Sequence, residues 1–289
     1  MDAVALASFY EKTGSKVVRS PSGYWYSPSR GVMNFFPYRH TCVGSNDYRT
    51  LWSSSRALVA RHTVPIVSAI GHKSCIYLCD PSTYSLDLLS ANTRSKVRRG
   101  LKNCRVEQVD FDVLARRGLA LQVSTLVRQD RKVPSNVEHS WMRMCQVAGQ
   151  TPDFEAWGAF YEDQLAALAI GFVFDQRYHI SVVRSAQSLL KYYPNNALVF
   201  EMVCHIASRP TLFDISYGLE SVQNELTGLD SFKLDMGFRR EPLKQYAAIR
   251  PLARPMLHAS ANVVRWLTHT RPDNQFLRRL NGTLRFAGL

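Results

Sequence analysis

The sequence predicts an α/β protein of the α+β type, with mixed, mostly antiparallel sheets flanked by helices. Two observations carry this prediction. Residues 15–80 contain short apolar and aromatic runs separated by turn residues, which is typical of strands. The second half combines hairpin signals with a single strand–helix–strand crossover instead of a regular series of them. With 289 residues, of which 46% are hydrophobic, the chain can form one large or two small domains.

The first half is predicted to consist of strands interrupted by one helix. Pro21-Ser22-Gly23 is a typical turn between two of the apolar runs. Apolar positions at near-helical spacing predict a helix over residues 48–61. A second helix, rich in basic residues, is expected to begin near Asn92-Thr93, which can cap it, and to end at Asn103. The predicted strands are residues 17–18, 24–26, 32–36, 64–70 and 75–78.

In the second half, two helices come first and a hairpin follows, with Glu162-Asp163 as its turn. Pro194-Asn195-Asn196 is predicted to start a helix, because proline is favoured in the first helical turn. Gly237 is expected to end a short helix, since glycine readily takes the left-handed conformation that closes helices. Helices are predicted over residues 112–128, 138–148, 194–207 and 229–236, strands over 154–161, 164–175, 178–184, 212–217 and 246–250, and a basic amphipathic helix or arm within 251–289.

The formal net charge of +13 is concentrated in two segments. Residues 94–117 contain eight basic and three acidic residues, and residues 239–289 contain ten basic and two acidic residues. Clustered positive charge favours binding of a polyanion or a phosphorylated ligand, and the alternative is a solvated surface that serves solubility. The candidate polyanion-binding residues are Arg94, Lys96, Arg98, Arg99 and Lys102 in the first segment and Arg265, Arg278 and Arg279 in the second.

Cysteine and histidine usage indicates reduced thiols and no metal centre. The six cysteines are scattered and form no Cys-x-x-Cys pair, so neither a disulfide scaffold nor a zinc ribbon is expected. The eight histidines show no His-x-x-x-His spacing, and we therefore expect no metal site. No stretch approaches the roughly 20 apolar residues of a membrane-spanning helix, so no transmembrane segment is predicted. A cytoplasmic location fits these features best.

Three segments, taken in order, carry a family resemblance. The first is the basic stretch Arg94–Asn103, and the second is the strand-to-helix junction Tyr193-Pro194-Asn195-Asn196-Ala197-Leu198. The third combines Asp214–Gly218 with Leu229–Phe238, which contains a Phe-Lys-x-x-x-Gly ending. In their order and spacing these segments resemble the GNAT superfamily of acyltransferases, and within it the Fem-like, double-GNAT branch. The likeness is strongest over residues 154–250 and weaker over residues 1–110.

The resemblance implies two GNAT-like subdomains, one over residues 1–110 and one over residues 111–250, followed by a basic helical tail over 251–289. The second subdomain would carry the donor site. No tightly bound cofactor is implied, because the donor, acyl-CoA or aminoacyl-tRNA, is a co-substrate. The donor's phosphate would lie at the start of the helix after the junction, beside Lys191, Tyr193, Asn195, Asn196 and Ala197.

The junction departs from the Gln/Arg-x-x-Gly-x-Gly/Ala pattern of coenzyme A-binding members. Residues 190–197 read Leu-Lys-Tyr-Tyr-Pro-Asn-Asn-Ala and contain no glycine, the residue that lets a backbone approach a phosphate closely. A helix N-terminus still offers free N–H groups and the positive end of the helix dipole to a phosphate. The donor is therefore open between a coenzyme A thioester and another activated acyl group.

Acyl transfer to an amine requires a bound carbonyl, donors for the tetrahedral oxyanion, and a route for protons. The resemblance implies that two splayed parallel strands, residues 178–184 and 212–217, expose backbone N–H groups to the carbonyl. Three candidate catalytic residues lie at or near their ends. Asp214 would accept the amine proton, with a structural carboxylate as an equal alternative, and Tyr217 and Lys233 would protonate or stabilise the leaving group.

These features together predict an N-acyltransferase that moves an acyl group from acyl-CoA to an amine on a small molecule or peptide. The first alternative is a Fem-like aminoacyltransferase with aminoacyl-tRNA as donor, and the basic segments favour such a polyanion. The second alternative is a non-catalytic GNAT-like module that binds nucleic acid or an anionic membrane surface through its basic tail. Only the enzymes require Asp214, Tyr217 and Lys233 to converge on one cleft.

Overall fold

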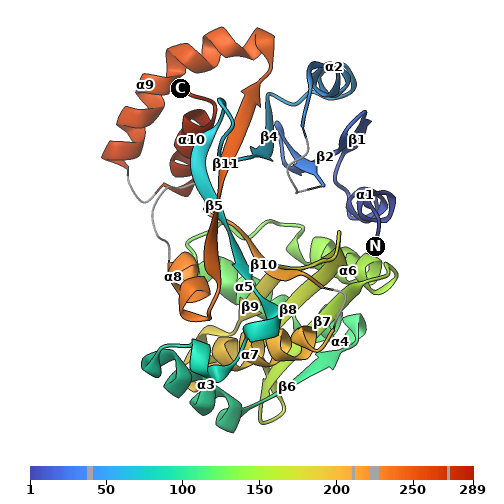
Figure 1. Ribbon diagram of the computed structural model, residues 1–289, viewed down its shortest axis with the longest axis vertical. Coiled ribbons are helices and arrows are strands. Elements are labelled where there is room, and N and C mark those ends of the chain that lie inside the picture. The colour runs from blue at the N-terminus through green and yellow to red at the C-terminus, as the bar shows by residue number, and fades with distance from the viewer. Residues whose placement is uncertain (38–41, 210–211, 222–227, 272–273) are drawn as a thin grey trace. The chain divides into compact units, whose positions relative to one another are not determined.

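The computed structural model describes residues 1–37, 42–209, 212–221, 228–271 and 274–289. Its contacts divide the chain into two compact units (Figure 1). Unit 1 comprises Met1–Ala5, Tyr77–Gly218 and Gly228–Arg240, and unit 2 comprises Leu6–Ile76, Leu219–Thr227 and Glu241–Leu289. Units defined by contacts are not the same as GNAT-like subdomains, so the expected division at residues 110 and 250 stays a prediction.

Unit 1 holds strands in the order β10-β9-β8-β7-β6, and the last residues of β5 (His72–Cys79) lie next to β10. Neighbours from β6 to β9 pair antiparallel, and β9 and β10 pair parallel. Its strands are β6 (Cys104–Val109), β7 (Phe154–Tyr161), β8 (Gln164–Phe174), β9 (Arg177–Ser185) and β10 (Asp214–Leu219). Its helices are α3 (Ala91–Asn103), α4 (Phe111–Arg117), α5 (Leu119–Arg128), α6 (Val137–Gly149), α7 (Pro194–Ala207) and α8 (Gly228–Asp235), with the short 3-10 helices η1 (Pro81–Thr83), η2 (Leu86–Leu88) and η3 (Gln187–Tyr192).

Unit 2 holds strands in the order β1-β2-β3-β4-β11-β5. In this order, β1 with β2, β2 with β3 and β4 with β11 are antiparallel pairs. Strands β3 and β4 are parallel, and helix α2 connects them. The strands are β1 (Val17–Ser20), β2 (Gly23–Ser29), β3 (Val32–Phe36), β4 (Val59–Val64), β5 (His72–Cys79) and β11 (Arg239–Ile249). The helices are α1 (Ala3–Lys12), α2 (Ser45–Ser54), η4 (Pro251–Ala253), α9 (Arg254–Thr270) and α10 (Gln275–Phe286).

The predicted fold class is confirmed, because helices flank a mixed, mostly antiparallel sheet. Two predictions in the first half are wrong. The helix expected over 48–61 ends at Ser54, and residues 59–61 lie in β4, where they pair with the end of β11. Of the strand expected over 64–70, only Val64 lies in a strand, at the end of β4, and the other residues form the turn between β4 and β5. The long-range partner β11 stabilises Val59 and Ala60 in a buried strand, which their helical spacing does not reveal.

The sequence pattern missed α1 and β6, and it joined two helices into one. The helix predicted over 112–128 is divided at Gly118 into α4 and α5. A Cβ atom at position 118 would lie 2.5 Å from the Trp141 ring and 2.6 Å from the Leu114 carbonyl oxygen. Glycine is therefore required there by close packing, and the chain turns at that point.

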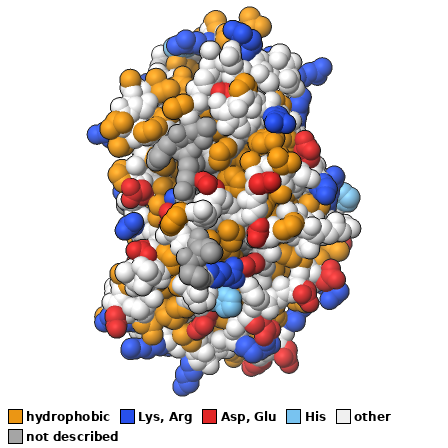
Figure 2. All heavy atoms as spheres, turned by 45° about the vertical axis from the view of Figure 1, so that its right-hand side comes forward, with side chains coloured by type: hydrophobic (Ala, Val, Ile, Leu, Met, Phe, Trp, Pro, Cys, Tyr) orange, Lys and Arg blue, Asp and Glu red, His pale blue; other side chains and the backbone are white. Residues whose placement is uncertain are grey.

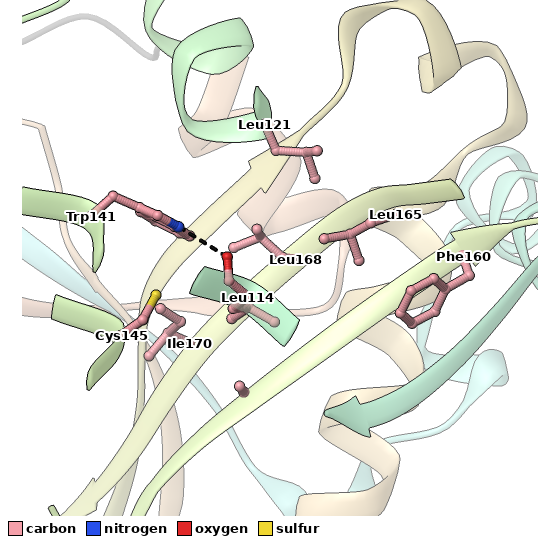
Figure 3. Packing of buried hydrophobic residues seen from close by; sticks show 9 residues of the cluster. Leu114, Leu121, Trp141, Cys145, Phe160, Leu165, Leu168 and Ile170 are labelled. Atoms are coloured by element: carbon pink, nitrogen blue, oxygen red, sulfur yellow. Dashed lines mark hydrogen bonds between the residues drawn. The ribbon is translucent and has the colours of Figure 1, made fainter. Parts of the chain in front are cut away.

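The core of unit 1 lies between helices α4, α5 and α6 and one face of strands β7 and β8 (Figure 3). The indole Nε1 of Trp141 donates a hydrogen bond of 2.9 Å to the carbonyl oxygen of Leu114, so the buried ring has a fixed position. The aliphatic side chains fill the space beside it. The cluster consists of Leu114, Leu121, Trp141, Cys145, Ala156, Phe160, Leu165, Leu168 and Ile170.

The C-terminal tail is part of the core of unit 2. Phe286 on α10 is only 1% exposed and packs with Val59 of β4 and Ala247 of β11. Helices α9 and α10 also pack on each other through Ala261, Val264 and Leu284. The tail was predicted as a basic amphipathic helix or arm, and in the structure it is a pair of packed helices.

Candidate functional site at the diverging strands β9 and β10

Strands β9 and β10 begin as a parallel pair and then separate. Their register pairs run from Asp214 with Arg177 to Ser216 with His179, which is three positions. Strand β9 nevertheless continues to Ser185, and β10 continues to Leu219. Backbone groups beyond the third pair are therefore not bonded between these two strands. Helix α7 forms the crossover that makes the pair parallel.

A β-bulge in β9 gives a physical reason for the separation. In the pairing of β8 with β9, Ile170 lies opposite Val182 while Gly171 lies opposite Ile180, so Ser181 is an extra residue. A bulge bends its strand and increases the local twist. Because Ser181 follows the last pair with β10 at His179, the bend carries the rest of β9 away from β10.

Two of the three predicted catalytic side chains, Tyr217 and Lys233, meet beyond the point of divergence. The Lys233 Nζ atom lies 5.7 Å from the centre of the Tyr217 ring and 4.3 Å from the centre of the Tyr77 ring. Burial raises the pKa of Tyr217 far above its usual value, so its hydroxyl stays protonated. That hydroxyl is covered and has no hydrogen-bond partner within the described residues.

Lys233 is buried, with 4% of its surface exposed. Its Nζ atom donates a hydrogen bond of 3.0 Å to Oδ1 of Asp230, one turn earlier on α8, and Asp230 is equally buried. A buried ammonium needs a nearby carboxylate or aromatic face to offset the loss of hydration. Lys233 has both, and α8 holds it in a fixed place.

Asp214 lies away from this pair. It forms a two-point ion pair with the guanidinium of Arg177, with 2.8 Å between Nη2 and Oδ2. Successive side chains of a strand point to opposite faces, so Asp214 and Tyr217, three positions apart on β10, face opposite ways. The ion pair joins the starts of β9 and β10, which favours the structural alternative for this carboxylate.

The predicted donor residues surround the start of α7, but they differ in accessibility. Lys191 is exposed at the end of η3, and its Nζ lies 5.1 Å from the Tyr192 ring centre. Asn196 and Ala197 are buried, and the amide of Asn196 contacts Sδ of Met236 at 3.4 Å. Their backbone N–H groups donate to the Tyr193 carbonyl at 3.1 and 3.2 Å. These two residues hold α7 in the core and present little to a ligand.

Tyr193 and Asn195 are the more accessible members of the same turn. Tyr193 takes the left-handed conformation, with φ of +57°, immediately before Pro194. The guanidinium of Arg99 on α3 lies 4.6 Å above the Tyr193 ring. Asn195 donates from Nδ2 to Oγ of Ser185 at 3.2 Å, which ties the start of α7 to the end of β9. Basic helix α3 thus borders the junction.

A cavity of about 190 Å³ opens beside the separated part of β9. Arg184 lines it, and its guanidinium is held by the Gln122 side chain and by the Val183 carbonyl at 2.8 Å. Burial, together with repulsion from Arg131, lowers the pKa of Arg184 to about 10. The other lining residues are mainly apolar: Pro134, Val137, Ser140, Trp141, Met144 and Val182, with Gln122.

No family model matches the sequence, and no curated protein matches it. Solved structures do. FemX aligns with a TM-score of 0.58 at 12% identity, over 86% of this chain and 92% of that chain. The C-terminal domain of a protein named lysylphosphatidylglycerol synthetase, from Agrobacterium fabrum, gives 0.57 at 13% identity, over 90% and 92%. A tandem GNAT protein from the clavulanic acid biosynthesis pathway gives 0.50 at 11% identity, over 81% and 83%.

The chain has a Fem-like GNAT fold. The predicted resemblance is thereby confirmed for the fold. Within this Fem-like GNAT fold, the predicted catalytic and donor residues form two groups, the Tyr217–Lys233 pair and the junction at the start of α7, and Asp214 lies apart from both in its ion pair with Arg177. Arg184 was missed by sequence reasoning, because an arginine within a strand pattern resembles any solvent-facing residue. The signal in the sequence that could have indicated Arg184 is its place, as a basic residue, in the strand that precedes the junction.

The predicted polyanion-binding residues lie in both units. Arg98, Arg99 and Lys102 are exposed on α3, and Arg94 and Lys96 are partly buried there. Arg265 and Arg279 are exposed on α9 and α10, and Arg278 is partly buried. On the face that Figure 2 draws, Lys and Arg side chains alternate with Asp and Glu side chains. In the part of the chain that the structure describes, no helix is both long and apolar enough to cross a membrane.

Proposed function

We propose that this chain is an N-acyltransferase, which moves an acyl group from an activated donor to an amine on a small molecule or peptide. The observation that supports it most is the separation of parallel strands β9 and β10 beside the buried Tyr217–Lys233 pair. Unpaired backbone N–H groups in such a gap can hold a carbonyl oxygen. The Fem-like GNAT fold is consistent with an acyltransferase, although it is evidence for the fold and not for the reaction.

In the proposed reaction the amine attacks the donor carbonyl and a tetrahedral oxyanion forms. The bond from the carbonyl carbon to the leaving oxygen or sulfur then breaks, and the proton that the nitrogen gives up passes through the Tyr217 hydroxyl to the departing alcohol or thiol. A hydroxyl that stays protonated can donate a hydrogen bond to the oxyanion or a proton to the leaving group, and Tyr217 meets that condition. Lys233 places a fixed positive charge next to the Tyr217 ring, where it stabilises the negative charge that develops. Asp214 has no part in this step, because it is paired with Arg177 on the opposite face.

The donor that fits the junction best is aminoacyl-tRNA. The start of α7 has no glycine, and the side chains of Asn196 and Ala197 are buried, so a close cradle for the pyrophosphate of coenzyme A is lacking. Basic helix α3 borders this junction, with Arg99 on the Tyr193 ring. A row of exposed cations beside the donor site favours a polynucleotide, since each neutralised phosphate adds to the affinity.

The 190 Å³ cavity at Arg184 has the size and lining to receive the transferred group or the acceptor. Its apolar walls favour an aliphatic or aromatic side chain, and Arg184 favours a carbonyl or carboxylate oxygen. Gln122 holds the guanidinium in place before any substrate arrives. Fixed donors of this kind require little reorganisation during the reaction.

Donor choice is tested by native mass spectrometry of the full chain with a mixed pool of aminoacyl-tRNA and, separately, with acetyl-CoA. We expect a retained complex with tRNA that weakens as salt rises. Replacement of Arg98 and Lys102 by Gln should weaken it at every salt concentration and flatten the salt dependence. The exposed pair Arg265 and Arg279 in unit 2, changed in the same way, is the matched comparison. Retention of acetyl-CoA alone would reject the tRNA donor and leave the acyltransferase proposal standing.

Catalysis is tested with Tyr217→Phe, using hydroxylamine as a generic amine that captures the acyl group. We expect at least a tenfold slower capture from the bound donor, because a single proton or hydrogen-bond donor contributes on the order of 10² in rate. Tyr178→Phe is the control, since it also removes a buried hydroxyl without a partner in the described residues. Lys233→Met should lower the rate similarly. Donor binding without any catalysed capture would favour the non-catalytic module.

A further inference from the structure

Unit 2 repeats the diverging pair of parallel strands. Strands β3 and β4 pair at three positions, from Val32 with Val59 to Asn34 with Arg61, and helix α2 is their crossover. Strand β3 continues to Phe36 and β4 continues to Val64 beyond the last pair. The arrangement matches β9, α7 and β10 of unit 1, but the side chains at the point of divergence are different.

A cavity of about 90 Å³ lies at this second point of divergence. Arg61 and Asn34, the last paired residues, both line it, together with Tyr26, Phe35, His62 and Gln245. A space of this size is larger than a single water molecule needs, so it can hold a small group of non-hydrogen atoms. That is the size of a small carboxylate or of the carboxylate end of a larger ligand.

Arg61 is a partly buried cation without a carboxylate among the described residues. Its Nη2 donates to Oε1 of Gln245 at 3.2 Å, which is a neutral acceptor. Burial lowers the pKa of Arg61, and its interaction with Tyr26 acts against this. A buried guanidinium that lacks an anion is costly, and a bound carboxylate would offset that cost through two parallel hydrogen bonds.

The neighbouring polar groups hold Arg61 and the cavity walls in place. Gln245 donates from Nε2 to Oγ of Ser74 at 2.8 Å and to the Glu220 carbonyl at 3.2 Å, so its Oε1 is turned toward Arg61. His62 bonds to the Tyr48 hydroxyl at 2.6 Å and to the Thr63 carbonyl at 3.1 Å. Burial lowers the pKa of His62, which leaves Arg61 as the cation of the cavity. Such a supported arrangement is typical of a preformed binding site.

We propose that unit 2 binds a small carboxylate-bearing ligand in the cavity between β3 and β4, with the Arg61 guanidinium as its anchor. Asn34 supports the assignment. Its Oδ1 atom is buried and has no hydrogen-bond partner in the described part of the chain. Rotation of this amide about its last torsion brings either a donor or an acceptor to a ligand that also carries an amine or hydroxyl group.

The proposal is tested with the full chain and ¹³C-labelled acetate, whose NMR line width reports binding. We expect saturable broadening with the native protein and at least tenfold weaker binding with Arg61→Gln. Arg61→Lys keeps the charge but loses the planar two-point contact, so it should also bind more weakly. Arg56→Gln is the matched control, because Arg56 is an exposed arginine five positions earlier. Circular dichroism checks that each variant is folded.

Acetate binding to Arg61→Gln and Arg61→Lys that equals binding to the native protein would overturn the proposal. Tighter binding of inorganic phosphate than of acetate would overturn the carboxylate assignment. The test involves no acyl transfer, so it stands apart from the proposed function. Lys233→Met should bind acetate normally, and loss of transfer in that variant with acetate binding retained would separate the two sites.

Discussion

At the scale of single residues, the role of a charged side chain depends on the groups that it contacts and not on its residue type. Lys233 and Asp214 both carry charges and both were predicted to be catalytic. Lys233 lies buried between Asp230 and two aromatic rings, whereas Asp214 closes an ion pair with Arg177 at the start of a strand. Asp230 precedes Lys233 by one turn, but Tyr77, Tyr217 and Arg177 are distant in sequence from the charges that they contact. A single sequence carries no signal for these distant partners.

The role of Asp214 can be tested by Asp214→Asn. We expect the free energy of unfolding to fall by about 1–3 kcal/mol, because a partly buried guanidinium loses its charged acceptor. Transfer to hydroxylamine should stay within about twofold of the native rate. Denaturant titration and the capture assay measure the two quantities. A tenfold loss of the transfer rate with an unchanged free energy of unfolding would show that Asp214 is catalytic.

His62 predicts a dependence of stability on pH. Burial lowers its folded-state pKa, although the Thr63 carbonyl and the charge of Asp47 act in the opposite direction. In the unfolded chain the imidazole titrates near its ordinary value of about 6.5. The unfolded state therefore binds the extra proton first as the pH falls, and stability decreases from about pH 7 downward.

The measurement for His62 is the midpoint of thermal unfolding between pH 7.5 and pH 5. We expect His62→Gln to lose less stability over this range than the native chain does. The exposed His258 on α9, replaced by Gln, should follow the native curve. Parallel curves for the native chain and His62→Gln would show that His62 is not the titrating group.

At the scale of elements, α3 and α7 pack so closely that a glycine is required between them. A Cβ atom at Gly100 would lie 2.6 Å from the Tyr193 carbonyl oxygen and 3.1 Å from Cβ of Ala197. This contact sets the distance between the basic helix and the donor junction. The sequence predicted both helices, but their shared contact depends on side-chain packing.

Gly100→Ala is expected to destabilise unit 1 by about 1–3 kcal/mol, because the helices must separate to admit a methyl group. Donor binding should weaken as well, since α7 would shift at its first turn. Gly228→Ala is the comparison, because a Cβ atom there meets nothing within 4 Å. Denaturant titration and native mass spectrometry measure the two effects. Equal stability of the two variants would contradict the packing argument.

At the scale of the whole molecule, both units use the same device, a parallel pair that opens next to a crossover helix. In unit 1 the opening carries a tyrosine and a lysine, and in unit 2 it carries an arginine and a histidine. The C-terminal tail was expected to be a separate basic segment, yet its last helix completes the core of unit 2. Exposed arginines on it are therefore better probes of anion binding than deletion of residues 251–289.

Phe286→Ala tests the structural part of the tail. We expect a loss of about 3–5 kcal/mol in the free energy of unfolding, since a nearly fully buried aromatic ring is removed from the core. Trp266→Ala on α9 removes a ring that is 62% exposed and should change stability by about 0.5 kcal/mol or less. Chemical denaturation provides both values. Similar small losses for the two variants would mean that α10 is not part of the core.

The sequence by itself determined the fold class, the hairpin at residues 162–163, the crossover through α7 and the junction at Tyr193-Pro194. These features depend on turn residues, helix starts and hydrophobic periods, which act between near neighbours in the chain. The tertiary structure alone decided that Lys233 is buried, that Asp214 is paired, and that Arg61 and Arg184 line cavities. Burial and ion pairing arise from residues that are far apart in sequence and become neighbours only when the sheet forms.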